Sequence, residues 1–120
     1  MDDHEVEVDE RWGDTDAYRQ SISHTAKYTQ ADFAAAKIDQ EAATELFVYA
    51  YGNSLPVDSE KVQEAVIAHR DAISKWFYHC SVEMQRGLAQ LYLSDPRFNK
   101  YYEGRVTGLA QYVHDAIMDQ

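Results

Sequence analysis

The most regular pattern of hydrophobic positions lies in the middle of the chain, between residues 58 and 80. Its apolar side chains recur every three or four residues, and at about 100° per residue they occupy roughly a third of a helix circumference. This spacing predicts a long amphipathic helix that begins at Asp58 or Ser59, after the turn at Leu55 and Pro56. The apolar stripe comprises Val62, Ala65, Val66, His69, Ile73, Trp76, Phe77 and Cys80.

Capping residues predict two helices before this segment. Thr29, followed three positions later by Asp32, is typical of a capping box and opens a helix that Gly52 closes. Thr15 is positioned to cap an earlier helix that runs to about Tyr28.

Three further helices follow the central segment. Ser81 is positioned to cap the first of them, Asp95 and Pro96 begin a short second one, and Thr107 begins the last. Strictly alternating β-branched runs are absent, so the sequence predicts an all-α fold. The inward positions of the first and last of these helices are Met84, Leu88, Leu91, Tyr92, Leu109, Val113 and Ile117.

Charge and hydrophobicity are distributed unevenly along the chain. Residues 1–45 carry 12 acidic and 4 basic side chains, and residues 46–120 carry 9 and 7. Large apolar side chains number 9 in the first range and 29 in the second. We therefore expect a single domain, 1–120, with an acidic, weakly held lid segment over residues 1–52 and a stable helical core over residues 58–120. In the alternative, the first helices pack firmly on the core through Trp12, Tyr18, Ile22, Phe33 and Ile38.

The composition excludes several classes of function. A net charge of −10 disfavours direct contact with nucleic acid, which requires clustered basic residues. The chain lacks both a leader-like N-terminus and an apolar run of about 20 residues, so the sequence predicts a soluble, cytoplasmic protein that does not enter a membrane.

Cys80 is the single cysteine, and its sequence neighbourhood supports two interpretations. A lone cysteine on an apolar stripe is usually an inert core residue. Nearby cations and a helix that starts at Ser81 would instead favour the nucleophilic thiolate. A cysteine hydrolase is disfavoured because the neighbouring His79 points about 100° away and His69 lies about three helical turns away. The sequence therefore predicts no enzyme and no catalytic residue.

Metal and cofactor sites have little support in the sequence. The histidines and the cysteine form none of the usual zinc-binding spacings, so we expect neither a metal nor a cofactor. A haem-binding, globin-like protein that uses His69 is the alternative of another class. Aromatic side chains, Trp76 among them, concentrate in the second half of the chain and suit a large, mostly apolar ligand.

Five sequence blocks together resemble the thiostrepton-binding effector domain of the TipA type, which also forms the C-terminal domain of some MerR-family transcription activators. The blocks follow the same order as in that family and extend over almost the whole chain. They are ERWGDTDAYRQS (10–21), AHR (68–70), YHCSVEM (78–84), LYLSDPRF (91–98) and GLAQYVHDAI (108–117).

The resemblance implies a globin-like helical bundle without haem, whose N-terminal helices close over a thiopeptide antibiotic. It also implies that Cys80 can add to a dehydroalanine of the antibiotic and form a thioether. The remaining site residues that it indicates fall into a ligand-binding group and a lid group. With the aromatic candidate Trp76 included, they are His69, Trp76, Tyr78 and Met84 for the ligand and Trp12, Asp16, Ala17, Tyr18 and Arg19 for the lid.

The function implied by this resemblance is the capture of thiopeptide antibiotics in drug sensing or resistance. In one alternative the domain is a reversible multidrug-sensing effector in which Cys80 only contributes packing. In either case DNA would be contacted only through a MerR-type domain, if the chain is joined to one.

Overall fold

The structure, a computed structural model, describes residues 19, 22–23 and 25–120 of the 120-residue chain. The ordered elements within the described residues are α-helices, which confirms the predicted all-α fold. These helices are α3 (Gln30–Gly52), α4 (Glu60–Trp76), α5 (Val82–Ser94), α6 (Pro96–Glu103) and α7 (Leu109–Met118). None of them combines the length and apolarity that crossing a bilayer requires.

Side-chain caps fix the first residues of two helices as predicted. The backbone amide of Asp32 donates to Thr29 Oγ1 over 3.2 Å, and the Thr29 amide donates back to Asp32 Oδ2 over 2.9 Å. Ser81 Oγ accepts from the Met84 amide over 3.1 Å and so opens α5. Each cap satisfies first-turn amides that have no partner within the helix.

The short helix α6 also begins where the sequence predicts. The side chain of Asp95 accepts from the Arg97 amide over 3.0 Å, and Pro96 occupies the first helical turn. Proline suits this position because its missing amide hydrogen would have no partner there.

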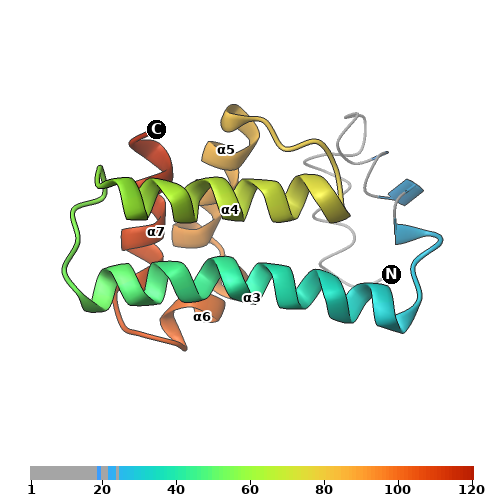
Figure 1. The fold of residues 1–120 in the computed structure, drawn as a ribbon, viewed down its shortest axis with the longest axis horizontal. Helices are drawn as coiled ribbons and strands as arrows, with labels where there is room; N and C mark the ends of the chain where they lie inside the picture. The colour runs from blue at the N-terminus through green and yellow to red at the C-terminus, as the bar shows by residue number, and fades with distance from the viewer. Residues whose placement is uncertain (1–18, 20–21, 24) are drawn as a thin grey trace.

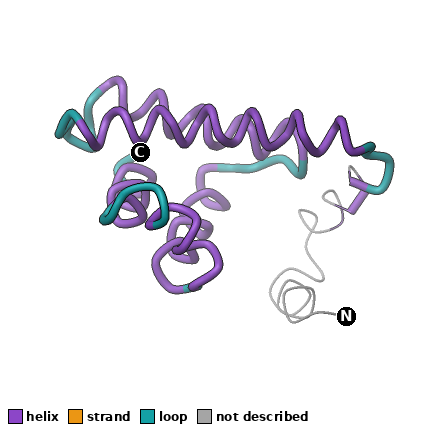
Figure 2. Tube along the Cα trace, turned by 90° about the horizontal axis from the view of Figure 1, so that it is seen from below, coloured by secondary structure: helices purple, strands orange, loops and turns teal. Residues whose placement is uncertain are grey.

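The helices form two layers. Helices α3 and α4 lie side by side and run in opposite directions, as Figure 1 shows. Helices α5, α6 and α7 pack against one face of this pair, mainly beneath the C-terminal part of α3 and the N-terminal part of α4 (Figure 2). The core between the layers includes the fully buried side chains of Phe47, Val62, Val66, Leu109, Val113 and Ile117.

The structure corrects the predicted end of the central helix. Helix α4 stops at Trp76, so Cys80 lies in the connection to α5 instead of on the apolar stripe of α4. Two hydrogen bonds accompany this end, one from Tyr28 before α3 and one within the end of α4 and its connection to α5. Tyr28 donates its hydroxyl to the carbonyl of Trp76, and Ser74 Oγ accepts from the Cys80 amide over 3.0 Å.

The start of the last helix is also displaced from its prediction. Helix α7 begins at Leu109 after Gly108, which has a left-handed backbone with φ of 91°, and not at Thr107. The carboxylate of Glu103 takes over the capping function, because it accepts from the Gly108 amide over 3.0 Å and the Ala110 amide over 2.9 Å. A cap supplied by the preceding helix is not visible in the sequence next to α7.

The C-terminal half of α3 is part of the hydrophobic core. It inserts Phe47 and Ala50 into this core. The predicted lid range 1–52 therefore includes a segment that belongs to the core. The helix predicted to start at Thr15 lies mostly outside the described residues.

Three of the side chains expected to pack the first helices on the core lie at the surface instead. Ile22, Phe33 and Ile38 are all exposed, and Ile38 retains 68% of its accessible surface. The firmly packed alternative is therefore wrong for these three positions, whereas Trp12 and Tyr18 lie outside the described residues.

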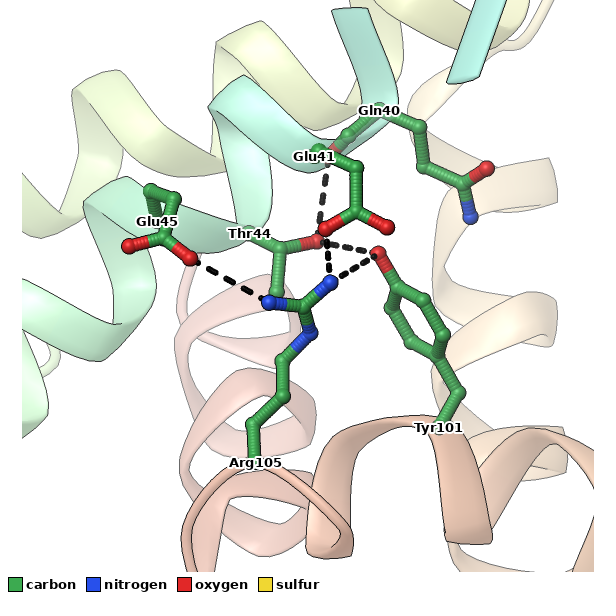
Figure 3. Close-up of polar contacts among 6 residues, drawn as sticks. All are labelled: Gln40, Glu41, Thr44, Glu45, Tyr101 and Arg105. Carbon is green, nitrogen blue, oxygen red and sulfur yellow. Dashed lines mark hydrogen bonds and ion pairs between the residues drawn. The ribbon is translucent and has the colours of Figure 1, made fainter. Parts of the chain in front are cut away.

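A polar cluster fastens the middle of α3 to the end of α6, as Figure 3 shows. Arg105 forms ion pairs with Glu41 and Glu45 and lies over the ring of Tyr101 at 5.0 Å. The Tyr101 hydroxyl lies 3.1 Å from Thr44 Oγ1. These contacts hold α3 against the second layer from Glu41 onward.

Candidate functional site

A small hollow lies where α3, α4 and α5 meet. Its cavity volume is about 70 Å³. Small side chains on α3 and α4 leave this space open, and aromatic rings from the end of α4 and from α5 form part of its wall. The lining residues are Ala36, Gln40, Ala43, His69, Ala72, Ile73, Phe77 and Tyr92.

His69 is a buried titratable group of this wall, and it is hydrogen-bonded at both ring nitrogens. Nε2 lies 2.8 Å from the Tyr92 hydroxyl, and Nδ1 lies 2.8 Å from the side-chain nitrogen of Gln85. The imidazole also packs edge-on against Phe47 and Tyr92.

The surroundings of His69 favour its neutral form. Burial away from water lowers the pKa of His69 from 6.5 to about 4, and the positive charge of Arg70 lowers it further in the same direction. The wall of the hollow is therefore uncharged at neutral pH.

Because Gln85 and Tyr92 occupy both nitrogens, a haem iron would have to displace one of them to bind His69. No group of three or more His, Cys, Asp or Glu side chains suited to a metal ion occurs within the described range.

Cys80 does not lie in this hollow, and its environment differs from the sequence expectation. The residue is 2% exposed, and burial raises the pKa of its thiol to about 11 although Arg70 acts in the opposite direction. At the start of α5 the Met84 amide donates to Ser81 Oγ and is therefore not available to the sulfur. The sulfur lies 3.7 Å from the carbonyl of Ser81, the geometry of a thiol that donates a weak hydrogen bond.

Three other predicted ligand-binding residues also lie outside the hollow. Tyr78 is buried in the core, where burial raises the pKa of its hydroxyl far above 10, and Met84 packs partly buried against the same core. Trp76 is half-buried and donates from Nε1 to Asp39 Oδ2 over 2.7 Å. Of the predicted group, His69 alone lines the hollow.

Trp76 belongs to an aromatic clamp, which we define as Tyr28, Phe33, Asp39, Lys75 and Trp76. The ring of Tyr28 packs edge-on against both Phe33 and Trp76, with centroid distances of 5.5 and 5.7 Å. Lys75 Nζ lies 3.3 Å from Asp39 Oδ2. The clamp ties the start of α3 to the end of α4.

Most of the predicted lid residues are not among the residues that the structure describes. Trp12, Asp16, Ala17 and Tyr18 lie outside the described residues, and Arg19 is exposed.

Sequence reasoning missed most of the lining. Phe77 and Tyr92 were visible as inward aromatic positions, but Ala36, Ala43 and Ala72 gave no signal beyond their small size. Their role depends on α3 and α4 facing each other at these points.

The comparisons with known proteins identify the family. Residues 4–119 match the model of the TipAS antibiotic-recognition domain. The HTH-type transcriptional activator TipA of Streptomyces coelicolor and that of Streptomyces lividans are each 41% identical over 117 residues, which is 98% of this chain and 46% of TipA. The HTH-type transcriptional activator mta of Bacillus subtilis is 36% identical over 61 residues, 51% of this chain and 24% of mta.

A solved structure agrees with these sequence matches. TipAS from Streptomyces lividans in complex with nosiheptide, described as a thiopeptide antibiotic multidrug resistance system, superimposes with a TM-score of 0.87 at 41% identity. The match covers 96% of this chain and 80% of that one, whereas the chain spans about half the length of the TipA sequences. Since the sequence blocks, the family model and the globin-like helical fold agree, the chain belongs to the TipAS antibiotic-recognition domain family.

Proposed function

We propose that this domain binds thiopeptide antibiotics, with the hollow between α3, α4 and α5 as the deepest part of its site. The observation that carries the proposal is the hollow itself, an uncharged recess with alanine, isoleucine and aromatic walls in a chain of this family. Apolar recesses with few polar groups are typical of small-molecule sites. The S. lividans relative was solved with the thiopeptide nosiheptide.

The size of the hollow implies that a thiopeptide occupies more than this space. A cavity of about 70 Å³ accommodates a few water molecules, whereas a cavity of roughly 150 Å³ holds a benzene ring and sites for drug-sized ligands enclose roughly 300–1,000 Å³. Part of one ring of the antibiotic would enter the hollow, and the remainder of the ligand would lie outside it. A second segment of the protein is then needed to cover the exposed part of the ligand.

We assign this covering role to residues 1–27. Helix α3 is tied to α4 by the Asp39–Trp76 hydrogen bond and to α6 by Arg105, so it belongs to the framework. The Tyr28 hydroxyl donates to the carbonyl of Trp76, and we place the junction between framework and lid at this residue. Amide hydrogen exchange tests this assignment, because added nosiheptide should protect residues 1–27 and leave α3 unchanged. Equal protection of both segments by the drug contradicts the boundary.

Filling the hollow tests the site directly. Ala36→Leu adds a bulky side chain to the lining. Ala34→Leu adds the same side chain two residues earlier on α3, at an exposed position that does not line the hollow. Nosiheptide should bind Ala36→Leu at least about tenfold more weakly, because a ring of the ligand can no longer enter, and should bind Ala34→Leu as it binds the wild type. Calorimetry measures both. Equal affinity of all three proteins places the binding site elsewhere.

We further propose covalent capture as a second, slower step. The Cys80 thiol would add across the carbon–carbon double bond of a dehydroalanine: sulfur bonds to the terminal carbon and a proton goes to the other carbon, so nothing leaves and nothing is oxidised. Because the thiol is buried with a pKa of about 11, the step requires that Cys80 becomes exposed after binding.

Intact-mass measurement under denaturing conditions separates capture from reversible binding. With thiostrepton, the wild type should slowly gain the mass of the antibiotic, and Cys80→Ser should retain binding without the gain. Absence of adduct in the wild type after prolonged incubation favours the alternative of a reversible multidrug-sensing effector domain.

The biological role that fits this chemistry is antibiotic sensing or resistance by a cytoplasmic binding protein that is not an enzyme. Since the chain corresponds to about half of TipA, transcription activation would need a separate MerR-type domain that contacts DNA. Expression of the domain alone tests sequestration, which should raise the nosiheptide concentration that inhibits a sensitive bacterium. The Ala36→Leu variant should lose this protection.

A further inference from the structure

A chain of hydrogen bonds connects the hollow with the C-terminal end of α7. Gln85, which is 0% exposed, donates from its side-chain nitrogen to His69 Nδ1 and to the carbonyl of Val66, each over 2.8 Å. Its side-chain oxygen accepts from Gln120 Nε2 over 2.7 Å and from Arg70 Nη1 over 3.3 Å. All the donors and acceptors of the Gln85 amide are therefore used.

Arg70 and the carbonyl of Val66 determine which way the Gln85 amide points. A guanidinium group only donates hydrogen bonds, and the carbonyl of Val66 only accepts them. The oxygen of Gln85 must therefore face Arg70, and its nitrogen must face Val66 and His69. The opposite orientation would bring two donors together at Arg70 and two acceptors together at Val66.

The orientation of Gln85 in turn determines the proton position on His69. Because Gln85 donates to Nδ1, this nitrogen carries no hydrogen, and the ring proton of the neutral imidazole is on Nε2. His69 then donates from Nε2 to the Tyr92 hydroxyl, which is hydrogen-bonded to Tyr102. Arg70 and the carbonyl of Val66 thus fix the polarity of the hydrogen bonds up to the wall of the hollow.

We propose that Gln85, oriented by Arg70, is a positioning residue of the antibiotic site that holds His69 in its uncharged, Nε2-protonated form. This inference rests on the proposed function, because His69 and Tyr92 line the hollow. A wall on which His69 and Tyr92 already have hydrogen-bond partners suits an uncharged, flat part of a ligand, whereas a protonated imidazole would lose its hydration on binding without gaining a partner.

The groups packed around His69 are consistent with this role. The ring faces the apolar side chain of Phe47 from α3, and Arg70, the charged neighbour on α4, disfavours a second positive charge. On the other side Tyr92 contacts the ring, and the titratable groups that act on Tyr92 are two further hydroxyls and a thiol. All are uncharged at neutral pH, and burial raises the pKa of each. These groups are Tyr78, Cys80, Tyr92 and Tyr102.

Nitrogen-15 NMR of the histidine side chains tests the inference without any ligand. In the wild type, His69 should show a hydrogen-bearing Nε2 and a bare Nδ1, unchanged from pH 8 to pH 5.5. Gln85→Met removes the donor to Nδ1, so the spectrum should no longer show the Nε2-protonated tautomer alone. Gln85→Glu presents an ionised acceptor to Nδ1, so His69 should take up a second proton at a higher pH than in the wild type.

Gln63→Met serves as the matched control. Gln63 is a partly buried glutamine whose side chain donates to the carbonyls of Val57 and Ala116, away from His69. Its replacement should reduce stability without changing the His69 signals. If the wild type carries the proton on Nδ1, or if both Gln85 variants leave the His69 signals unchanged, the inference is wrong.

Binding of nosiheptide at several pH values completes the test. Wild-type affinity should not change between pH 8 and pH 5.5, whereas Gln85→Glu should lose affinity about tenfold for each pH unit below its new His69 pKa. Gln63→Met should follow the wild type. If Gln85→Glu changes the His69 NMR signals but its nosiheptide affinity does not depend on pH, the positioning role is refuted. If the wild type does not bind nosiheptide at all, the proposed function is refuted instead.

Discussion

Acidification tests whether His69 is neutral in the folded protein. Its pKa is about 4 in the folded state and 6.5 when it is solvated in the unfolded chain. Above pH 6.5 the imidazole is neutral in both states, so the folded protein retains its full stability. Between pH 6.5 and pH 4 the unfolded chain binds a proton that the folded protein excludes, and the free energy of unfolding therefore decreases as the pH falls.

The size of this loss follows from the two pKa values. They differ by about 2.5, and each pKa unit corresponds to about 1.4 kcal/mol, so His69 alone removes about 3 kcal/mol between pH 7 and pH 4. This is a large part of the roughly 5–15 kcal/mol that stabilises a domain. The carboxylates of Asp39 and Glu103 also titrate in the acid range, since hydrogen bonds lower their pKa values, and they must be separated from the imidazole.

Urea denaturation of the wild type and of His69→Gln at several pH values separates the contribution of the imidazole from that of the two carboxylates. The variant lacks the imidazole and keeps both carboxylates, so the difference in unfolding free energy between the two proteins should narrow by about 3 kcal/mol from pH 7 to pH 4. His79→Gln removes an exposed imidazole and serves as the control. A constant difference between wild type and His69→Gln over this range would refute the assignment of a neutral, buried His69.

Substitutions at three further positions test the framework, each by urea denaturation. Gly108→Ala should cost about 2 kcal/mol or more, because the left-handed backbone disfavours alanine and the new Cβ would clash with the Tyr51 hydroxyl. Thr29→Ala should cost about 1 kcal/mol through loss of the capping box, and Thr29→Ser should restore most of it. Arg105→Ala should cost about 1 kcal/mol, and added salt should reduce the difference from wild type, because the ion pairs are partly exposed.

The helix starts that the sequence predicted well are those set by nearby residues. Thr29 with Asp32, Ser81, and Asp95 with Pro96 each act within a few positions of the amides that they satisfy. The stop of α4 at Trp76 instead coincides with a hydrogen bond from Tyr28, which lies 48 positions earlier. The sequence pattern alone would have carried the helix on through Cys80, since the apolar spacing continues without a break.

The candidate site was harder to predict because it is a cavity left open by small side chains. Ala36 and Ala72 come from different helices, and the space between them exists only because α3 and α4 pack face to face at these positions. His69 was recognisable as a polar residue on an apolar stripe. Its neutral state was not, because that depends on Gln85 and on Arg70, whose positions follow from the packing of α5 against α4.

The buried state of Cys80 changes how recognition and capture relate to each other. At neutral pH a thiol with a pKa of about 11 is ionised in about one molecule in ten thousand, so its spontaneous reaction with any electrophile is slow. At the proposed site, an antibiotic that enters the hollow would contact His69, Tyr92 and the alanine walls, and these contacts would not require the sulfur. Affinity and specificity would therefore be determined at the hollow, and the thioether would affect only how long the complex persists. On this reasoning Cys80→Ser should leave the equilibrium affinity unchanged and alter only the fraction of antibiotic that survives denaturation.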